Sequence, residues 1–155
     1  MQLPESAFVR KDFMLRQLDF PPEVRLTKKS LLRWFALALG LISLQESRTS
    51  CLDVLDALFT LTLNKKMAPT TLDIQNFIKE KYNKEISEKL IRYHLSKLIS
   101  LELLQRKKNR YYWNNAPNAE KNNLAEAFEY WVGKGIKETL QNTKDALKLL
   151  VEKYE

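Results

Sequence analysis

The order of elements between residues 50 and 113 limits the fold more than any other feature of the sequence. Apolar residues recur at helical spacing in 50–64, 71–82 and 86–101. From residue 103 the pattern changes, and the polar run KKNR separates two short stretches with strand character. We therefore predict three helices that lead directly into a β-hairpin with a charged turn.

Composition supports a helix-rich globular chain. Only three glycines and five prolines occur in 155 residues, which favours long helices over a turn-rich β architecture. The hydrophobic content of 45% is sufficient for a core. We predict a mainly α fold with one domain and helical extensions at both ends.

Polar residues mark the expected helix starts. Ser50 is the expected N-cap of the first helix, with Asp53 and Asp56 turned outward; Thr70 or Thr71 caps the second, and Ser87 the third. The inward stripes expected for the second and third helices are Leu72, Ile74, Phe77, Ile78 and Tyr82, and Leu90, Ile91, Leu95, Leu98 and Ile99.

The flanking segments give three expected parts: 1–48, 49–114 and 115–155. Residues 1–27 have the pattern of an arm packed on the body or on a partner, and 30–45 form a helix apolar on most sides, expected to be buried. A helical pattern at 118–153 is interrupted by Gly133 and Gly135. We expect it to build a homodimer with helix 30–45; the alternative is that it folds back on its own domain.

The positive charge is local. Residues 1–78, 79–110 and 111–155 carry net charges of +2, +6 and −1, which together give the chain's +7. A concentrated basic patch attracts nucleic acid or another acidic surface. The alternative is a solvated surface on which lysines cluster by accident.

The segment ISEKLIRYHLSKLISLELLQRKKNRYYW resembles the recognition helix and wing of ArsR-like and MarR-like winged helix-turn-helix regulators. Their helix follows the form S-x-x-x-(V/I)-x-x-H-L-x-x-L, which Ser87, Ile91, His94, Leu95 and Leu98 match, and Leu103-Leu104 match the start of the wing strand. Glu102 stands where those families usually have glycine. The resemblance covers 50–114 and implies three helices plus a β-hairpin wing.

The resemblance also implies which residues contact DNA. Lys89 and Arg92 on the recognition helix are expected at base edges, while the wing neutralises phosphates. The full set is Thr70, Thr71, Ser87, Lys89, Arg92, Tyr93, Ser96, Lys97, Arg106, Lys107, Lys108, Asn109 and Arg110. Alternate residues of the cluster Tyr111, Tyr112 and Trp113 are expected to close the core under the wing; the alternative is stacking on single-stranded bases.

The expected function is sequence-specific binding of double-stranded DNA by a homodimeric transcriptional regulator. The alternative is a winged-helix module that binds protein or RNA within a larger nucleic-acid-processing or ribosomal assembly. With one histidine and one cysteine, and no metal or phosphate-loop motif, we expect no enzyme, cofactor or metal. His94 is expected on the inward side of its helix.

The sequence predicts a cytoplasmic protein that does not enter a membrane. The amino terminus lacks the basic start and apolar stretch of a secretory signal. The longest apolar run, 31–44, is shorter than the ~20 residues that span a bilayer. Cys51 is expected as a small buried hydrophobe.

Overall fold

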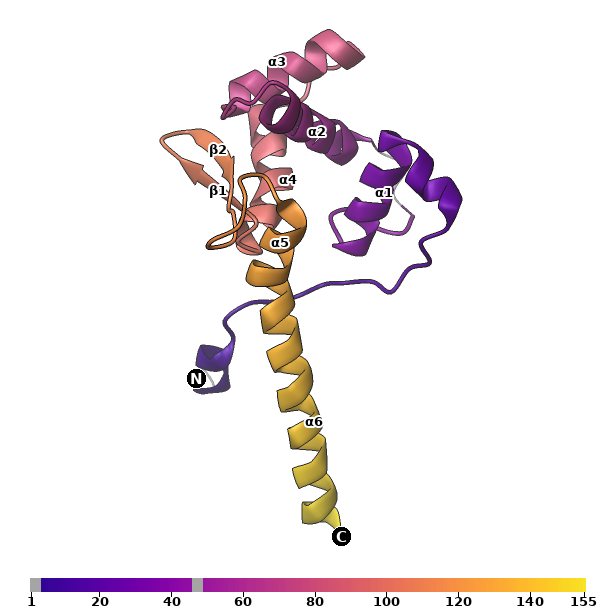
Figure 1. Cartoon of the computed structure of the whole chain (residues 1–155), viewed down its shortest axis with the longest axis vertical. Coiled ribbons are helices and arrows are strands. Elements are labelled where there is room, and N and C mark those ends of the chain that lie inside the picture. The colour runs from indigo at the N-terminus through magenta and orange to yellow at the C-terminus, as the bar shows by residue number, and fades with distance from the viewer. Residues whose placement is uncertain (1–3, 46–48) are drawn as a thin grey trace.

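The computed structural model describes residues 4–45 and 49–155 and shows a mainly helical chain with a two-stranded antiparallel sheet (Figure 1). Its helices and strands are α1 (Lys28–Ala38), α2 (Ser50–Phe59), α3 (Thr71–Tyr82), α4 (Glu88–Ser100), β1 (Leu104–Lys107), β2 (Arg110–Trp113), α5 (Leu124–Phe128) and α6 (Lys134–Tyr154). The prediction of a mainly α fold is confirmed. No helix among the described residues is long and apolar enough to cross a membrane.

The core is built around α2, whose residues from Cys51 to Leu58 are all buried. α3 and α4 pack on α2 and on each other. Their buried apolar side chains are Ile74, Ile78, Ile91, Leu95 and Leu98. Each such side chain stabilises the fold by about 1.5–3 kcal/mol. Both helices are therefore held with one fixed face toward α2.

Two of the expected inward residues lie outside the core. Leu72 is 53% exposed, because at about 100° per residue it falls on the side of α3 opposite to Ile74. Leu90 lies at the margin of the buried stripe of α4 and is 37% exposed. The expected stripes were therefore too wide.

Side-chain caps fix the starts of α3 and α4. The Thr70 hydroxyl accepts from Asp73 N at 3.1 Å, while the Asp73 carboxylate accepts from Thr70 N at 2.9 Å. Ser87 accepts from Leu90 N at 3.1 Å, as expected. The expected Ser50 cap is wrong: Ser50 lies inside α2, and its hydroxyl is 3.2 Å from His94 Nε2.

The hairpin closes through a tight turn at Lys108-Asn109. Both residues have positive φ, 51° and 67°, as a two-residue type I′ loop requires. In the register that results, Arg106 pairs with Tyr111. Tyr111 and Trp113 are buried, which confirms that the aromatic residues close the core, while Tyr112 is 40% exposed.

A π-helical segment, Thr60–Asn64, extends α2 beneath the hairpin. Thr62 donates its hydroxyl to Leu58 O at 2.6 Å and accepts from Trp113 Nε1 at 2.9 Å. This bond satisfies a buried indole N–H and ties the hairpin to α2.

The expected helix over 30–45 is wrong at its carboxyl end. α1 ends at Ala38, because Gly40 takes a left-handed conformation with φ 68°. Gly40 N and Leu41 N donate to Leu37 O and Ala36 O, the two bonds of a Schellman motif. α1 buries only Ala36 and Ala38, and Leu41 and Ile42 enter the core after the turn. The boundary expected between 48 and 49 borders residues 46–48, which lie outside the described part of the chain.

Basic side chains of the amino-terminal arm bind it to the body. The Arg16 guanidinium donates to Leu37 O at 2.7 Å and to Ile42 O at 3.0 Å, on either side of the turn that ends α1. Lys11 donates to Trp131 O and pairs with Glu102, both at 2.9 Å. The arm therefore joins α1, the α4–β1 turn and the carboxy-terminal helices.

The expected helical pattern of 118–153 is wrong at its start, because residues 118–123 form turns in which Asn118 and Asn122 have positive φ; from Leu124 onward it forms one continuous helical rod. A π-helical segment, Glu129–Gly133, joins α5 to α6, so neither Gly133 nor Gly135 ends the helix. Gly135 allows close approach of the arm, since a Cβ there would lie 2.7 Å from Phe13 Cζ. α6 buries none of its residues and projects away from the body (Figure 1), so it does not fold back on its own domain.

The turn between α4 and β1 gives a test of the backbone. Glu102 adopts φ 66°, a conformation that glycine accepts without steric cost. We expect Glu102→Gly to be more stable than Glu102→Ala by about 1 kcal/mol. Both variants lose the Lys11 ion pair, so the difference in their free energies of unfolding in urea isolates the backbone term. Equal stabilities would contradict the left-handed turn.

Candidate nucleic-acid interface

α4 has one buried face and one exposed cationic face. Ile91, His94, Leu95 and Leu98 are buried. Lys89, Arg92, Tyr93 and Ser96 are exposed, as the sequence predicted. Because the buried face is docked on α2 and α3, the positive charges of this helix face solvent.

Lys97 is held more tightly than expected. It is half-buried, and its ammonium donates to Leu41 O at 3.3 Å. The same ammonium lies 5.2 Å from the centre of the Tyr93 ring. Ser96 in turn donates its hydroxyl to Tyr93 O at 2.6 Å. Lys97 therefore connects α4 to the turn after α1, and Arg92 and Lys89 are the more accessible cations.

The hairpin adds four basic side chains, all exposed: Arg106, Lys107, Lys108 and Arg110. Lys108 and Asn109 form the tip of the turn. The Arg106 guanidinium lies 5.5 Å from the Tyr111 ring centre. The Arg110 guanidinium donates to Ala68 O at 2.8 Å, and the Arg110 backbone forms an isolated antiparallel β-bridge with Thr70. Both contacts fix the hairpin against the loop before α3. β1 packs against α4, and Figure 1 shows the hairpin beside that helix.

The two threonines expected at the interface differ in position. Thr70 caps α3 and is half-buried. Thr71 is 3% exposed, and its hydroxyl is bonded to Tyr111 OH at 3.1 Å. The Thr71 side chain is therefore a core hydrogen-bonding group and does not face a ligand, a position that helix spacing alone did not reveal.

The cations of α4 and the hairpin outnumber the acids of these elements and form no ion pair within the described part of the chain. Among the described residues, every ion pair lies elsewhere in the chain. Clustered cations that outnumber the nearby acids attract a polyanion. The interface therefore carries a positive field that the protein itself does not neutralise.

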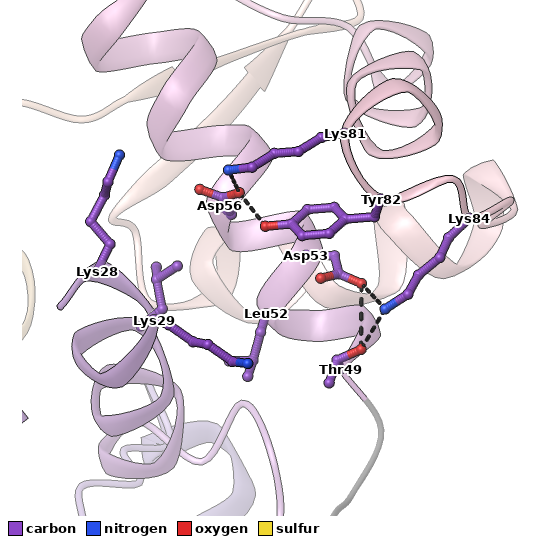
Figure 2. Close-up of a pocket in the computed structure, with 10 residues that line it drawn as sticks. Lys28, Lys29, Thr49, Leu52, Asp53, Asp56, Lys81, Tyr82 and Lys84 are labelled. Atoms are coloured by element: carbon purple, nitrogen blue, oxygen red, sulfur yellow. Dashed lines mark hydrogen bonds and ion pairs between the residues drawn. The ribbon is translucent and has the colours of Figure 1, made fainter.

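The lysines at and just after the end of α3, unlike the cations of α4 and the hairpin, form ion pairs with acids of α2. Asp53 and Asp56 are 5% and 6% exposed, so the expectation that they turn outward is wrong. Lys84 lies 2.9 Å from Asp53, and Lys81 lies 2.6 Å from Asp56. Figure 2 shows both pairs beside a cavity of about 320 Å³ that Lys28 and Lys29 also line. The burial of α2 on all sides required partners for its acids, and α3 supplies them.

Tyr82 completes this cluster, with its hydroxyl 2.5 Å from Asp56 Oδ2. Burial alone raises the pKa of Asp56, but hydrogen bonds from Lys81 and Tyr82 and the charge of Lys81 outweigh it, so the pKa lies below its usual range. The hydrogen bond to Asp56 raises the pKa of Lys81. Burial, followed by the same carboxylate, raises the pKa of Tyr82.

A sequence signal for these pairs does exist. The acids are three residues apart in an otherwise apolar helix, and the lysines 81 and 84 have the same spacing. The first acid pairs with the second lysine and the second acid with the first, which fits α2 and the segment from the end of α3 to Lys84 running in opposite directions. Spacing alone did not identify α3 as the partner.

His94 and Cys51 are both buried, as expected. His94 faces Ser50 of α2, and so belongs to the packing between α2 and α4. Within residues 4–45 and 49–155 no group of three or more potential metal ligands comes together.

No protein-family model, curated protein or solved structure matches this chain. The functional argument therefore depends on the geometry and charge of α4 and the hairpin.

The Asp56 cluster predicts a pH-dependent contribution to stability. At pH 7 we expect Asp56→Asn to lower the free energy of unfolding by about 1–2 kcal/mol, since Lys81 is half-exposed and part of the interaction is screened. A carboxyl with a lowered pKa stabilises the fold above its unfolded pKa and loses that contribution as the pH falls through its folded value. The difference from wild type should therefore vanish well below about pH 4.

Urea denaturation at a series of pH values measures this difference. Asp145→Asn is the matched control, because Asp145 is exposed on α6 and accepts only from Gln141. We expect it to change stability by less than about 0.5 kcal/mol. A loss that is equal for both variants, or independent of pH, would contradict the assigned cluster.

Proposed function

We propose that residues 49–114 are a winged helix-turn-helix module that binds double-stranded DNA sequence-specifically. We further propose that the protein is a transcriptional regulator that acts as a homodimer, and that binding rather than catalysis is its activity. The observation that carries this proposal is the contrast between two sets of cations. Lys81 and Lys84 are neutralised by buried acids, whereas the cations of α4 and the hairpin form no ion pair among the described residues.

The shape of α4 suits the major groove. The groove is about 12 Å wide and admits one helix. α4 keeps its apolar side on α2 and α3, so its exposed side can enter without loss of packing. Arg92 and Lys89 would meet base edges, where arginine can bond in bidentate fashion to guanine. Tyr93 and Ser96 border them, and Ser87 lies at the amino end, where backbone N–H groups favour phosphate.

The hairpin would supply affinity more than sequence preference. Lys108 lies at the tip of the turn and Lys107 directly before it. The positive φ angles of Lys108 and Asn109 fix the conformation of this turn. Arg106 and Asn109 lie beside them. Such side chains neutralise phosphates or enter the adjacent minor groove. Lys97 and Arg110 are proposed as positioning residues, because each already bonds to a backbone carbonyl of the protein.

Neutralising the interface should reduce DNA affinity and its dependence on salt. We compare wild type with the triple variant Arg92→Gln/Lys107→Gln/Lys108→Gln on a duplex of about 30 base pairs by fluorescence anisotropy. If Lys107 and Lys108 each neutralise one phosphate, the slope of log K against log salt should fall in magnitude by about 1.8, and by up to about 2.7 if Arg92 also neutralises one. Affinity should fall by at least about tenfold.

The control variant, Lys121→Gln/Lys134→Gln/Lys148→Gln, removes the same charge from exposed positions outside the interface. It should keep the wild-type slope. If both triple variants lose equal affinity, only net charge matters and the interface is wrong. If wild type prefers structured RNA to duplex at every salt concentration, the alternative of an RNA-binding module holds instead.

Substitution of Arg92 and substitution of Lys108 should affect DNA binding in different ways. In a selection of bound sequences from a random duplex pool, Arg92→Ala should lose preference at a particular base pair, at a cost of about 1–3 kcal/mol. Lys108→Ala should weaken all sequences nearly equally. If Arg92→Ala keeps the wild-type sequence preference, the proposal that α4 recognises the DNA sequence is wrong.

A further inference from the structure

α6 carries an apolar stripe that no other part of the described chain covers. Leu140, Leu147, Leu150 and Tyr154 are 62, 58, 50 and 87% exposed. The helix that carries them extends alone from the body (Figure 1). Soluble monomers rarely expose contiguous apolar surface of more than about a few hundred Å², and larger patches mark interaction sites.

The stripe has the spacing of a coiled coil. Its positions are separated by alternating steps of four and three residues: Ile136, Leu140, Thr143, Leu147, Leu150 and Tyr154. This repeat of seven keeps one line of side chains facing a partner helix. Ile136 is half-buried against the core, so the free part begins one turn later. We name Leu140, Thr143, Leu147, Leu150 and Tyr154 the α6 seam.

The amino-terminal arm covers the opposite side of the helix. Arg10 pairs with Glu138 at 2.6 Å, and Phe13 packs against Gly135. At about 100° per residue, position 138 lies opposite to the seam, and position 135 lies about 100° to one side of it. These contacts involve only the first turns of α6, where the arm crosses the helix (Figure 1), and the seam stays exposed.

We propose that the α6 seam pairs with the same seam of a second copy in a parallel two-stranded coiled coil. A second copy fits because it supplies the same seven-residue spacing, and no charged residue interrupts the seam. This proposal names the surface of the homodimer that the proposed function includes. Its test contains no DNA, so the two can fail separately.

The flanking charges favour the parallel direction. In a parallel pair, Thr139 faces Lys144 of the second copy, and Ala146 faces Val151 of the second copy, so no like charges meet. An antiparallel pair either brings the two Lys144 side chains together or leaves Leu140 without an apolar partner among the described residues. The parallel pair also places both copies of α4 at the same end of the coiled coil.

The first experiment compares Leu140→Glu/Leu147→Glu with Leu149→Glu by analytical ultracentrifugation of the full chain without DNA. Leu149 is 56% exposed on the same helix but lies on the side opposite to the seam. We expect dimers for wild type and Leu149→Glu, and a dissociation constant at least about 100-fold higher for the seam variant. Circular dichroism checks that the helices persist, since the substituted leucines do not support the core.

Three results would overturn the proposal: a wild type that stays monomeric at about 100 µM, equal effects of the two variants, or an intact dimer in the seam variant. A monomer that still binds duplex would overturn the dimer alone. A dimer with no affinity for duplex would overturn the proposed function alone.

The second experiment tests the direction. In a parallel pair the two Tyr154 positions face each other, so Tyr154→Cys should form a covalent dimer under mild oxidation. Leu149→Cys should not, because its side chain points away from the partner. Dimers by ultracentrifugation without the Tyr154→Cys disulfide would overturn the parallel arrangement.

Discussion

The packing of α4 against α2 and α3 is the constraint on which the rest of the structure depends. Ile91, Leu95 and Leu98 are fully buried, so the helix has one rotation that satisfies them. That rotation turns Arg92 and Lys89 to solvent, because neighbouring residues are displaced by about 100° around the axis. β1 begins soon after the same helix, so the position of the hairpin follows from it as well. Hydrophobic burial thereby determines where the charges lie.

Lysines have two different roles in this protein. Those at the end of α3 neutralise two carboxylates that the burial of α2 removes from water, and a buried charge without a partner would be costly. Those of α4 and the hairpin form no ion pair among the described residues. A net charge counted along the sequence mixes the two roles. The positive field of the molecule comes from the second group, and it is concentrated on the elements proposed to meet DNA.

The arm links this interface to the carboxy-terminal helix. Lys11 bonds both to Glu102, in the turn between α4 and β1, and to the backbone before α6. Arg16 holds the end of α1 in the same way. These contacts couple the direction of α6 to the position of α4. In a dimer joined through the α6 seam, they would set the relation between the two recognition helices.

The sequence by itself determined the order of helices and hairpin, and most helix starts. These depend on local signals, such as the Thr70–Asp73 capping box, the Ser87 cap and the change from helical to strand period, which act within about four residues. Tertiary structure alone decided that Asp53 and Asp56 are buried, that Thr71 bonds to Tyr111, and that Lys97 is held by Leu41. Each of these contacts joins residues 25 to 56 positions apart. Periodicity tells which residues share a face of a helix, but not which distant segment covers that face.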